Sequence, residues 1–128
     1  MGDINQYFSK SEFACKDRCG NDNISMDLIE RLNRLRTTYA KPIYINSACR
    51  CKKHNQEVGG VPDSAHVSEG KEGEAIDIRI ASSQELYDLL HINFMYLLFN
   101  RVGIGKTLLH LDVSKTLPQN VVWIYSNK

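Results

Sequence analysis

Residues 64–80 read SAHVSEGKEGEAIDIRI, and the last seven of them, EAIDIRI at 74–80, decide the fold. Their alternation of side chains, rich in isoleucine, predicts a β-strand. One face of this strand would carry Ala75, Asp77 and Arg79, and the other Ile76, Ile78 and Ile80. A buried carboxylate is costly unless a partner compensates its charge. Asp77 therefore predicts a cation beside the strand, and we consider a metal ion first.

Helices and further strands are predicted on both sides of this strand. Ser25 is the expected N-cap of a helix that runs to about Tyr39. Ser82 is the expected N-cap of a second helix, which runs to about Phe99. In the second helix the expected core face is Leu86, Leu89, Leu90, Phe94, Leu97 and Leu98. Shorter helical segments are expected at 9–12 and 52–58, and strands at 42–48, 101–105, 108–113 and 121–125. Strands and helices do not alternate regularly along the chain as they do in βαβ units. This order predicts one α+β domain, residues 1–128, with a mainly antiparallel sheet flanked by two to three helices.

The composition is that of an ordinary globular domain. The 128 residues are 42% hydrophobic and 24% charged, with a net charge of +1. This balance of charges gives no electrostatic attraction to nucleic acid or anionic membranes, so neither is an expected partner. We also expect the protein to be a monomer. The longest apolar run, FMYLLF at 94–99, is too short to cross a bilayer. The N-terminal MGDINQYFSK lacks the apolar stretch of a secretion signal, so we expect synthesis in the cytoplasm.

The four cysteines form two close pairs, Cys15 with Cys19 and Cys49 with Cys51. Their number fits two disulfides or one four-thiolate metal site, although neither spacing is the CxxC of a zinc knuckle. In a chain without a secretion signal, free buried thiols are an equally good interpretation. The sequence leaves these three states open.

Polar residues in two apolar segments point to a metal site. His110 and Asp112 are two positions apart in the strand predicted at 108–113, so they share a face, and His66 precedes the strand that carries Asp77. Two histidines and one carboxylate form a common open zinc site that leaves a fourth position for water. In the alternative interpretation no metal is bound, and Asp77 pairs with Arg79 or Arg50.

Three segments together resemble the zinc D-alanyl-D-alanine carboxypeptidase family, in its small phage-type branch. They are INSACRCKKHNQEVGGVPDSAH at 45–66, GEAIDI at 73–78 and LLHLDV at 108–113. The family shares its fold with lysostaphin-type peptidases and the hedgehog signalling domain, so the resemblance implies that fold here. Two departures stand out. Ala48 replaces a usual glycine, and SEGKEG at 68–73 lengthens the loop between His66 and Asp77.

The resemblance implies that His66, Asp77 and His110 bind one Zn²⁺, which activates water for amide hydrolysis. Arg50 would stabilise the oxyanion or a substrate carboxylate, its alternative role being a surface salt bridge. Ser64 would hydrogen-bond the substrate or only cap the turn before His66. His54 and Asn55 would hold their loop, and Trp123 would belong to the core or to a cleft wall.

The general base is not fixed by the motifs. Several family members have an acidic residue three positions before the last histidine, where this chain has Thr107. Asp112 is the expected base, and its alternative role is to orient a ligand. Glu69, Glu72 and Glu74 are further candidates.

The implied activity is hydrolysis of peptide bonds in bacterial peptidoglycan, in a stem peptide or a cross-bridge. A phage endolysin that reaches the cell wall by phage-mediated release fits this small chain, and either carboxypeptidase or endopeptidase action fits the motifs. The alternative is a catalytically inactive zinc module that binds cell wall or protein, and Thr107 favours it.

Overall fold

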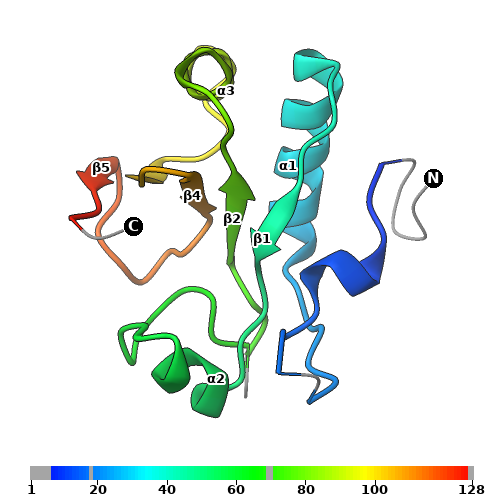
Figure 1. Ribbon diagram of the computed structural model, residues 1–128, viewed down its shortest axis with the longest axis vertical. Coiled ribbons are helices and arrows are strands. Elements are labelled where there is room, and N and C mark those ends of the chain that lie inside the picture. Colours follow the sequence, from blue (N-terminus) through cyan, green and yellow to red (C-terminus); the bar gives the residue numbers. More distant parts are fainter. Residues whose placement is uncertain (1–6, 18, 69–70, 127–128) are drawn as a thin grey trace.

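Five strands form the sheet expected around residues 74–80, in the order β1-β2-β4-β3-β5 (Figure 1). They are β1 (Ile45–Ser47), β2 (Ala75–Arg79), β3 (Arg101–Ile104), β4 (Leu108–Asp112) and β5 (Val121–Ile124). All neighbours pair antiparallel except β3 and β5, which are parallel. The computed structural model describes residues 7–17, 19–68 and 71–126. Its α+β architecture and mainly antiparallel sheet confirm the predicted fold class.

In the described residues, one 3₁₀ helix and three α-helices accompany the sheet. They are η1 (Lys10–Phe13), α1 (Met26–Tyr39), α2 (Lys52–Glu57) and α3 (Ser83–Met95). The predicted caps form, because the hydroxyl of Ser25 accepts from the Leu28 amide at 3.3 Å and that of Ser82 from the Glu85 amide at 3.1 Å. Helix α1 ends at Ala40, whose φ of 62° lies in the left-handed region. Helices α2 and α3 lie at opposite ends of the molecule (Figure 1).

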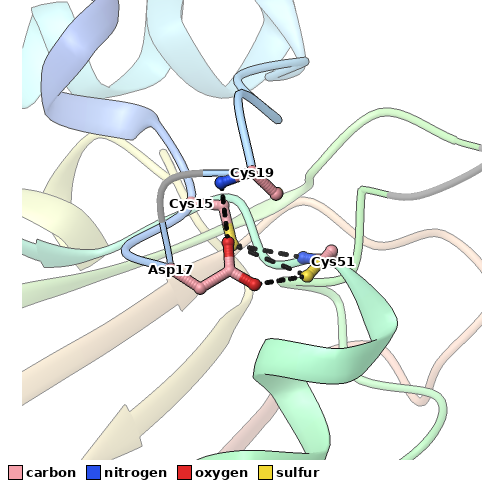
Figure 2. Close-up of side chains that lie close together, drawn as sticks. All are labelled: Cys15, Asp17, Cys19 and Cys51. Carbon is pink, nitrogen blue, oxygen red and sulfur yellow. Dashed lines mark hydrogen bonds between the residues drawn. The ribbon is translucent and has the colours of Figure 1, made fainter.

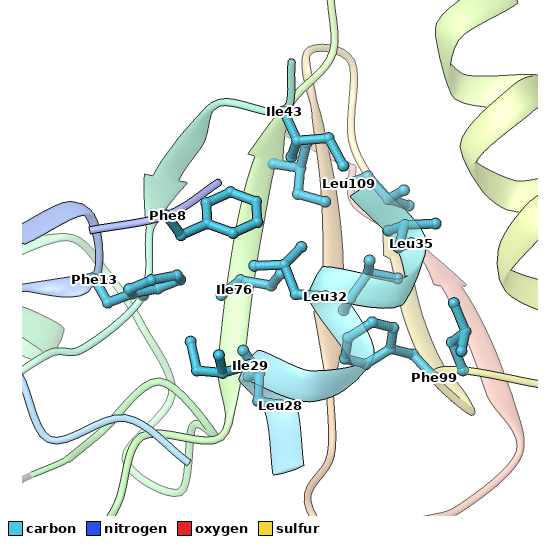
Figure 3. Packing of buried hydrophobic residues seen from close by; sticks show 14 of the residues in the cluster. Phe8, Phe13, Leu28, Ile29, Leu32, Leu35, Ile43, Ile76, Phe99 and Leu109 are labelled. Atoms are coloured by element: carbon cyan, nitrogen blue, oxygen red, sulfur yellow. The ribbon is translucent and has the colours of Figure 1, made fainter. Parts of the chain in front are cut away.

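The two faces of β2 separate the core from the polar residues, as the alternation predicted. Ile76 is buried in the hydrophobic core with leucines of α1 (Figure 3). Ile78 belongs to the same core. Helix α1 contributes Leu28, Leu32 and Leu35, each fully buried. The apolar stripe of α1 therefore covers one face of the sheet and leaves the face with Asp77 for other contacts.

The expected end of α3 at Phe99 is wrong, because the helix stops at Met95. The buried side chain of Asn93 accepts from the Phe99 amide at 2.9 Å and donates to the Phe99 carbonyl at 3.0 Å. These bonds hold a chain reversal in which Leu97 adopts a φ of 53°. Phe94 and Leu97, expected in the core, are instead 46% and 81% exposed.

The strand expected at 42–48 is also shorter than predicted. Of the range 42–48, the structure assigns residues 45–47 to the strand β1. The register of β1 with β2 shifts between Ile45 and Ser47. Within the described ranges, no helix has the length and apolar character needed to cross a bilayer.

Candidate metal centre

A single row of residues crosses the polar face of the sheet. The register places Asp77 of β2 opposite His110 of β4, and His110 opposite Gly103 of β3. Gly103 is in turn aligned with Trp123 of β5. Neighbouring residues of such a row project from the same face of the sheet, so the pairing itself brings a carboxylate, an imidazole and an indole together.

His66 joins this row from the loop that precedes β2. Its Nε2 lies 3.2 Å from Oδ1 of Asp77, and Nδ1 of His110 lies 2.9 Å from the same oxygen. One ligand atom from each of the three residues lies within 4.8 Å of the other two. All three side chains are buried. The structure thus brings together the three residues that the sequence predicted as metal ligands.

The outer nitrogen of each imidazole already has an acceptor. Nδ1 of His66 lies 2.7 Å from the carbonyl oxygen of Ala48, and Nε2 of His110 lies 2.7 Å from Oδ2 of Asp112. Because a carbonyl or carboxylate oxygen accepts, these outer nitrogens carry the hydrogens. In neutral imidazoles, the inner nitrogens then direct two lone pairs at the oxygen of Asp77. Only a cation satisfies three such groups, so the donor set fits zinc.

The charge states of the cluster agree with this arrangement. Burial by itself would raise the pKa of Asp77, but His66 and His110 outweigh it and hold that pKa well below its usual range. Burial lowers the pKa of His66 despite the nearby carboxylate. Burial acts in the same direction on His110, where hydrogen bonds to Asp112 and Asp77 prevail and raise the pKa. Without a metal, a proton on His110 and the guanidinium of Arg50 are the positive charges that stabilise Asp77.

Arg50 approaches the same carboxylate from the other side. Its Nη2 lies 3.5 Å from Oδ2 of Asp77, and the side chain is only 6% exposed. Nε donates to Ser47 Oγ at 3.3 Å and Nη1 to Asn55 Oδ1 at 3.2 Å, which fixes the guanidinium. The pairing with Asp77 is thus a buried ion pair rather than a surface salt bridge.

The backbone of Arg50 also positions the loop that carries His66. Its amide donates to the His66 carbonyl at 2.9 Å, and its carbonyl accepts from the Ser68 amide at 2.8 Å. Ser64 Oγ accepts from the His66 amide at 3.2 Å, so Ser64 caps this turn, which is the second of its two expected roles. Arg50 and Ser64 therefore orient His66 before any substrate is considered.

Asn55 stabilises the neighbouring loop, in the role expected for it. Its amide nitrogen donates to the Val61 carbonyl at 2.8 Å. A Cβ on Gly60 would lie 2.1 Å from Asn55 Oδ1, so only glycine allows this approach. Gly59 has a φ of 76°, which also favours glycine. The Gly59–Gly60 pair thus lets the chain turn closely over Asn55.

Asp112 lies on the outer side of His110, away from Asp77. Its Oδ1 accepts from Arg101 Nε at 2.7 Å and from the Ser114 amide at 3.1 Å, while Oδ2 accepts from His110. Asp112 is 1% exposed. Both oxygens therefore have partners, and these contacts favour the orienting role over that of a general base. Arg101, which sequence reasoning missed, supplies the compensating charge for this buried carboxylate.

Trp123 covers the outer flank of the centre. Its ring centroid lies 5.2 Å from that of His110. A Cβ on Gly103 would lie 2.5 Å from Nε1 of Trp123, so the indole occupies the space that any side chain at this position would fill. Trp123 thus forms a wall of the site, which was one of its two expected places.

The other positions considered for the general base are Thr107, Glu69, Glu72 and Glu74. Thr107 is an exposed residue of the turn between β3 and β4. Glu74 lies 4.0 Å from Lys71 in a partly exposed ion pair. Glu72 is exposed, and Glu69 lies outside the described residues.

A comparison with models of protein families found a match. The model of the family described as Peptidase M15 matches residues 6–107, which include His66 and Asp77 and end three positions before His110. A comparison with curated proteins found no match. The family match covers most of the chain, and zinc dependence is a property of the family. The chain therefore belongs to the peptidase M15 family of zinc metallopeptidases.

Proposed function

We propose that this protein is a zinc-dependent peptidase that hydrolyses peptide bonds in the stem peptides or cross-bridges of bacterial peptidoglycan. The observation that carries the proposal is the convergence of His66 Nε2, Asp77 Oδ1 and His110 Nδ1, with both outer imidazole nitrogens already engaged. Three protein ligands leave a fourth position open, as catalytic zinc sites require. A structural zinc site would have a fourth protein ligand instead.

Zinc held by these three residues would supply a Lewis acid that polarises a carbonyl and acidifies a water molecule. The chain's own residues supply orientation and charge. Ala48 and Asp112 fix the two imidazole rings through their outer nitrogens. Arg50, held by Ser47 and Asn55, places a fixed positive charge beside Asp77, where it can stabilise negative charge that develops on a substrate oxygen.

The substrate follows from the resemblance of the motifs at 45–66, 73–78 and 108–113 to D-alanyl-D-alanine carboxypeptidases. In this proposal the protein acts on the cell wall after phage-mediated release, as an endolysin does. Removal of a terminal D-alanine and cleavage of a cross-bridge remain two forms of the same proposal, and Arg50 is the residue that would bind a terminal carboxylate.

A second candidate is a zinc-containing module that binds cell wall or protein without cutting it. Two observations favour it. Thr107 cannot accept a proton from water at neutral pH, and both oxygens of Asp112 are engaged with other partners. In this case the metal centre would stabilise the fold and the surface that binds the wall.

The test is incubation of the zinc-loaded protein with purified peptidoglycan of several cross-link types, followed by mass spectrometry of the soluble products. The first proposal predicts new amino termini or free D-alanine, and loss of both with His110→Ala. His91→Ala, which changes an exposed histidine of α3, is the matched control and should keep full activity. Binding to the walls without any product on every type would establish the second candidate instead.

A further inference from the structure

Three cysteines converge at a second place in the molecule, apart from His66, Asp77 and His110. Cys15 and Cys19 come from the segment that follows η1, and Cys51 immediately precedes α2 (Figure 2). Asp17 lies between them. One ligand atom from each of these four residues lies within 4.8 Å of the others. We call this group the thiol cluster.

The distances within the thiol cluster fit a metal ion better than a disulfide. Sγ of Cys15 and Sγ of Cys51 are 3.9 Å apart. A disulfide requires about 2.05 Å, whereas two thiolates bound to zinc at about 2.3 Å in a tetrahedron lie about 3.8 Å apart. Asp17 places Oδ1 at 3.1 Å from the first sulfur and Oδ2 at 2.9 Å from the second. The carboxylate, which accepts from both thiols, would therefore be within reach of an ion bound by the two sulfur atoms.

Backbone amides support the sulfur atoms. The Cys51 amide donates to Sγ of Cys15 at 3.4 Å, and the His54 amide donates to Sγ of Cys51 at 3.3 Å. Hydrogen bonds of this kind favour the thiolate form that binds metal. The Cys19 amide donates to Oδ1 of Asp17 at 2.9 Å, which fixes the carboxylate. The donors of the cluster are thus oriented before a metal binds.

We propose that Cys15, Asp17, Cys19 and Cys51 bind a second zinc ion, in a closed structural site. Four protein ligands that include three thiolates are typical of structural zinc and leave no position for a substrate. Cys49 is not part of this site, because its sulfur faces Gly73, where a Cβ would lie 3.3 Å from it. The four-thiolate site considered from the sequence is thereby replaced by a site with three thiolates and one carboxylate.

The second zinc would link the N-terminal segment that carries Cys15 to the segment of Arg50 and Cys51. That second segment positions the loop of His66. Cys51 follows Arg50, whose backbone pairs with His66 and Ser68. The Cys49 amide donates to the Phe13 carbonyl at 3.0 Å, so the two segments already touch beside the cluster. A metal that joins Cys15 to Cys51 stabilises this contact and, through Arg50, the loop of His66.

The primary test is metal analysis of the protein purified under reducing conditions. We expect two zinc ions per chain in the wild type, one in Cys51→Ser and two in the matched control Cys49→Ser. His110→Ala should also bind one zinc, but through the thiol cluster. Failure of this proposal therefore differs from failure of the proposed peptidase centre, because each variant removes a different ion. A wild type that binds one zinc, lost in His110→Ala and kept in Cys51→Ser, contradicts the proposal.

Cobalt substitution identifies the ligands without relying on activity. Thiolates bound to Co²⁺ give a strong charge-transfer absorption in the near ultraviolet, which histidine and carboxylate ligands do not give. We expect this band in the wild type, His110→Ala and Cys49→Ser, and not in Cys51→Ser. Should Cys51→Ser fail to fold, Cys19→Ser changes an exposed residue and should weaken the band. Absence of the band from the wild type overturns the proposal.

Thiol titration separates the metal site from a disulfide. The chelator-treated, denatured and unreduced protein should have four reactive thiols, one for each cysteine of the sequence. Two reactive thiols would show one disulfide, which must include at least one cysteine of the cluster and would contradict the zinc site.

Discussion

Asp112 is expected to act on the metal through His110. Asn at this position keeps the shape of the side chain but removes the charge that pairs with Arg101 and the full acceptor strength offered to His110. We expect Asp112→Asn to lower the affinity of the candidate metal centre for zinc by about 10- to 100-fold. Competition with a chromophoric chelator measures this affinity.

Asp63→Asn is the matched control, because Asp63 is exposed on the loop before His66 and should leave the affinity unchanged. The opposite pattern is equally informative. If Asp112→Asn abolishes hydrolysis while the zinc affinity stays at the wild-type value, Asp112 is the general base and the orienting role is refuted.

Gly103 and Trp123 give a second prediction for individual residues. Gly103→Ala introduces a Cβ 2.5 Å from Nε1 of Trp123, so the indole must move away from His110. Overpacking of this kind costs about 1–3 kcal/mol of unfolding free energy. In the Trp123→Leu background the cost of Gly103→Ala should largely disappear, since the clashing ring is gone. Urea denaturation of the four proteins in this double-mutant cycle measures the coupling. Equal costs in both backgrounds would show that the ring does not occupy this space.

Two of the three candidate ligands could be predicted because each violates a local pattern. Asp77 interrupts a strand of isoleucines, and His110 interrupts a strand of leucines. Arg101 and Gly103 could not be predicted in the same way. Their importance depends on the register of β3 against β4, which places Arg101 opposite Asp112 and Gly103 opposite His110. The alternation within the two strands does not specify that register, which depends on the geometry of the turn that joins them.

At the scale of elements, the end of α3 shows how a side chain can override periodicity. The apolar spacing of residues 86–98 continues past Met95, so periodicity alone extends the helix to Phe99. The fully buried side chain of Asn93 instead forms two hydrogen bonds with the backbone of Phe99. It donates to the carbonyl and accepts from the amide. A helix that continued to Phe99 could not make these bonds, and Phe94 and Leu97 are exposed as a result.

Removal of this amide should therefore destabilise the protein more than its size suggests. Asn93→Ala leaves a buried amide hydrogen and a buried carbonyl of Phe99 without partners, and we expect a loss of about 2–4 kcal/mol in unfolding free energy. Asn100→Ala is the control, because Asn100 is exposed and its side chain donates to the exposed side chains of Gln119 and Asn120, while its backbone bond to Val121 is kept. Thermal or urea denaturation measures both. Equal losses in the two variants would mean that the reversal after α3 does not depend on Asn93.

The strands themselves were predictable, but their order in the sheet was not. Alternation identifies a strand and its faces from a few neighbouring residues. The parallel pairing of β5 with β3, and the position of β4 between β2 and β3, depend on contacts between residues far apart in the chain. That order is what aligns Trp123 with His110.

For the whole molecule, the candidate metal centre would add a link between parts of the chain that backbone pairing already holds together. Its ligands come from β2, from β4 and from the loop that Arg50 positions. Zinc binds this arrangement only when all three parts are in place, so it should stabilise the folded state.

The chain has a single tryptophan, Trp123, whose ring lies 5.2 Å from that of His110, so its fluorescence reports on this centre. We expect Co²⁺ to quench the fluorescence of the metal-free wild type and of His91→Ala, and to leave that of His110→Ala much less affected.

Zinc at 100 times its dissociation constant should add about 2.7 kcal/mol to the unfolding free energy at this centre, which raises Tm by about 10 °C for a chain of this length. The rise should be smaller in His110→Ala, where the thiol cluster alone can respond. Suppose that zinc raised the Tm of the wild type and of His110→Ala equally, and that Co²⁺ quenched the fluorescence of both equally. The stabilising metal would then lie elsewhere, and the proposed catalytic centre on this sheet would lose its support.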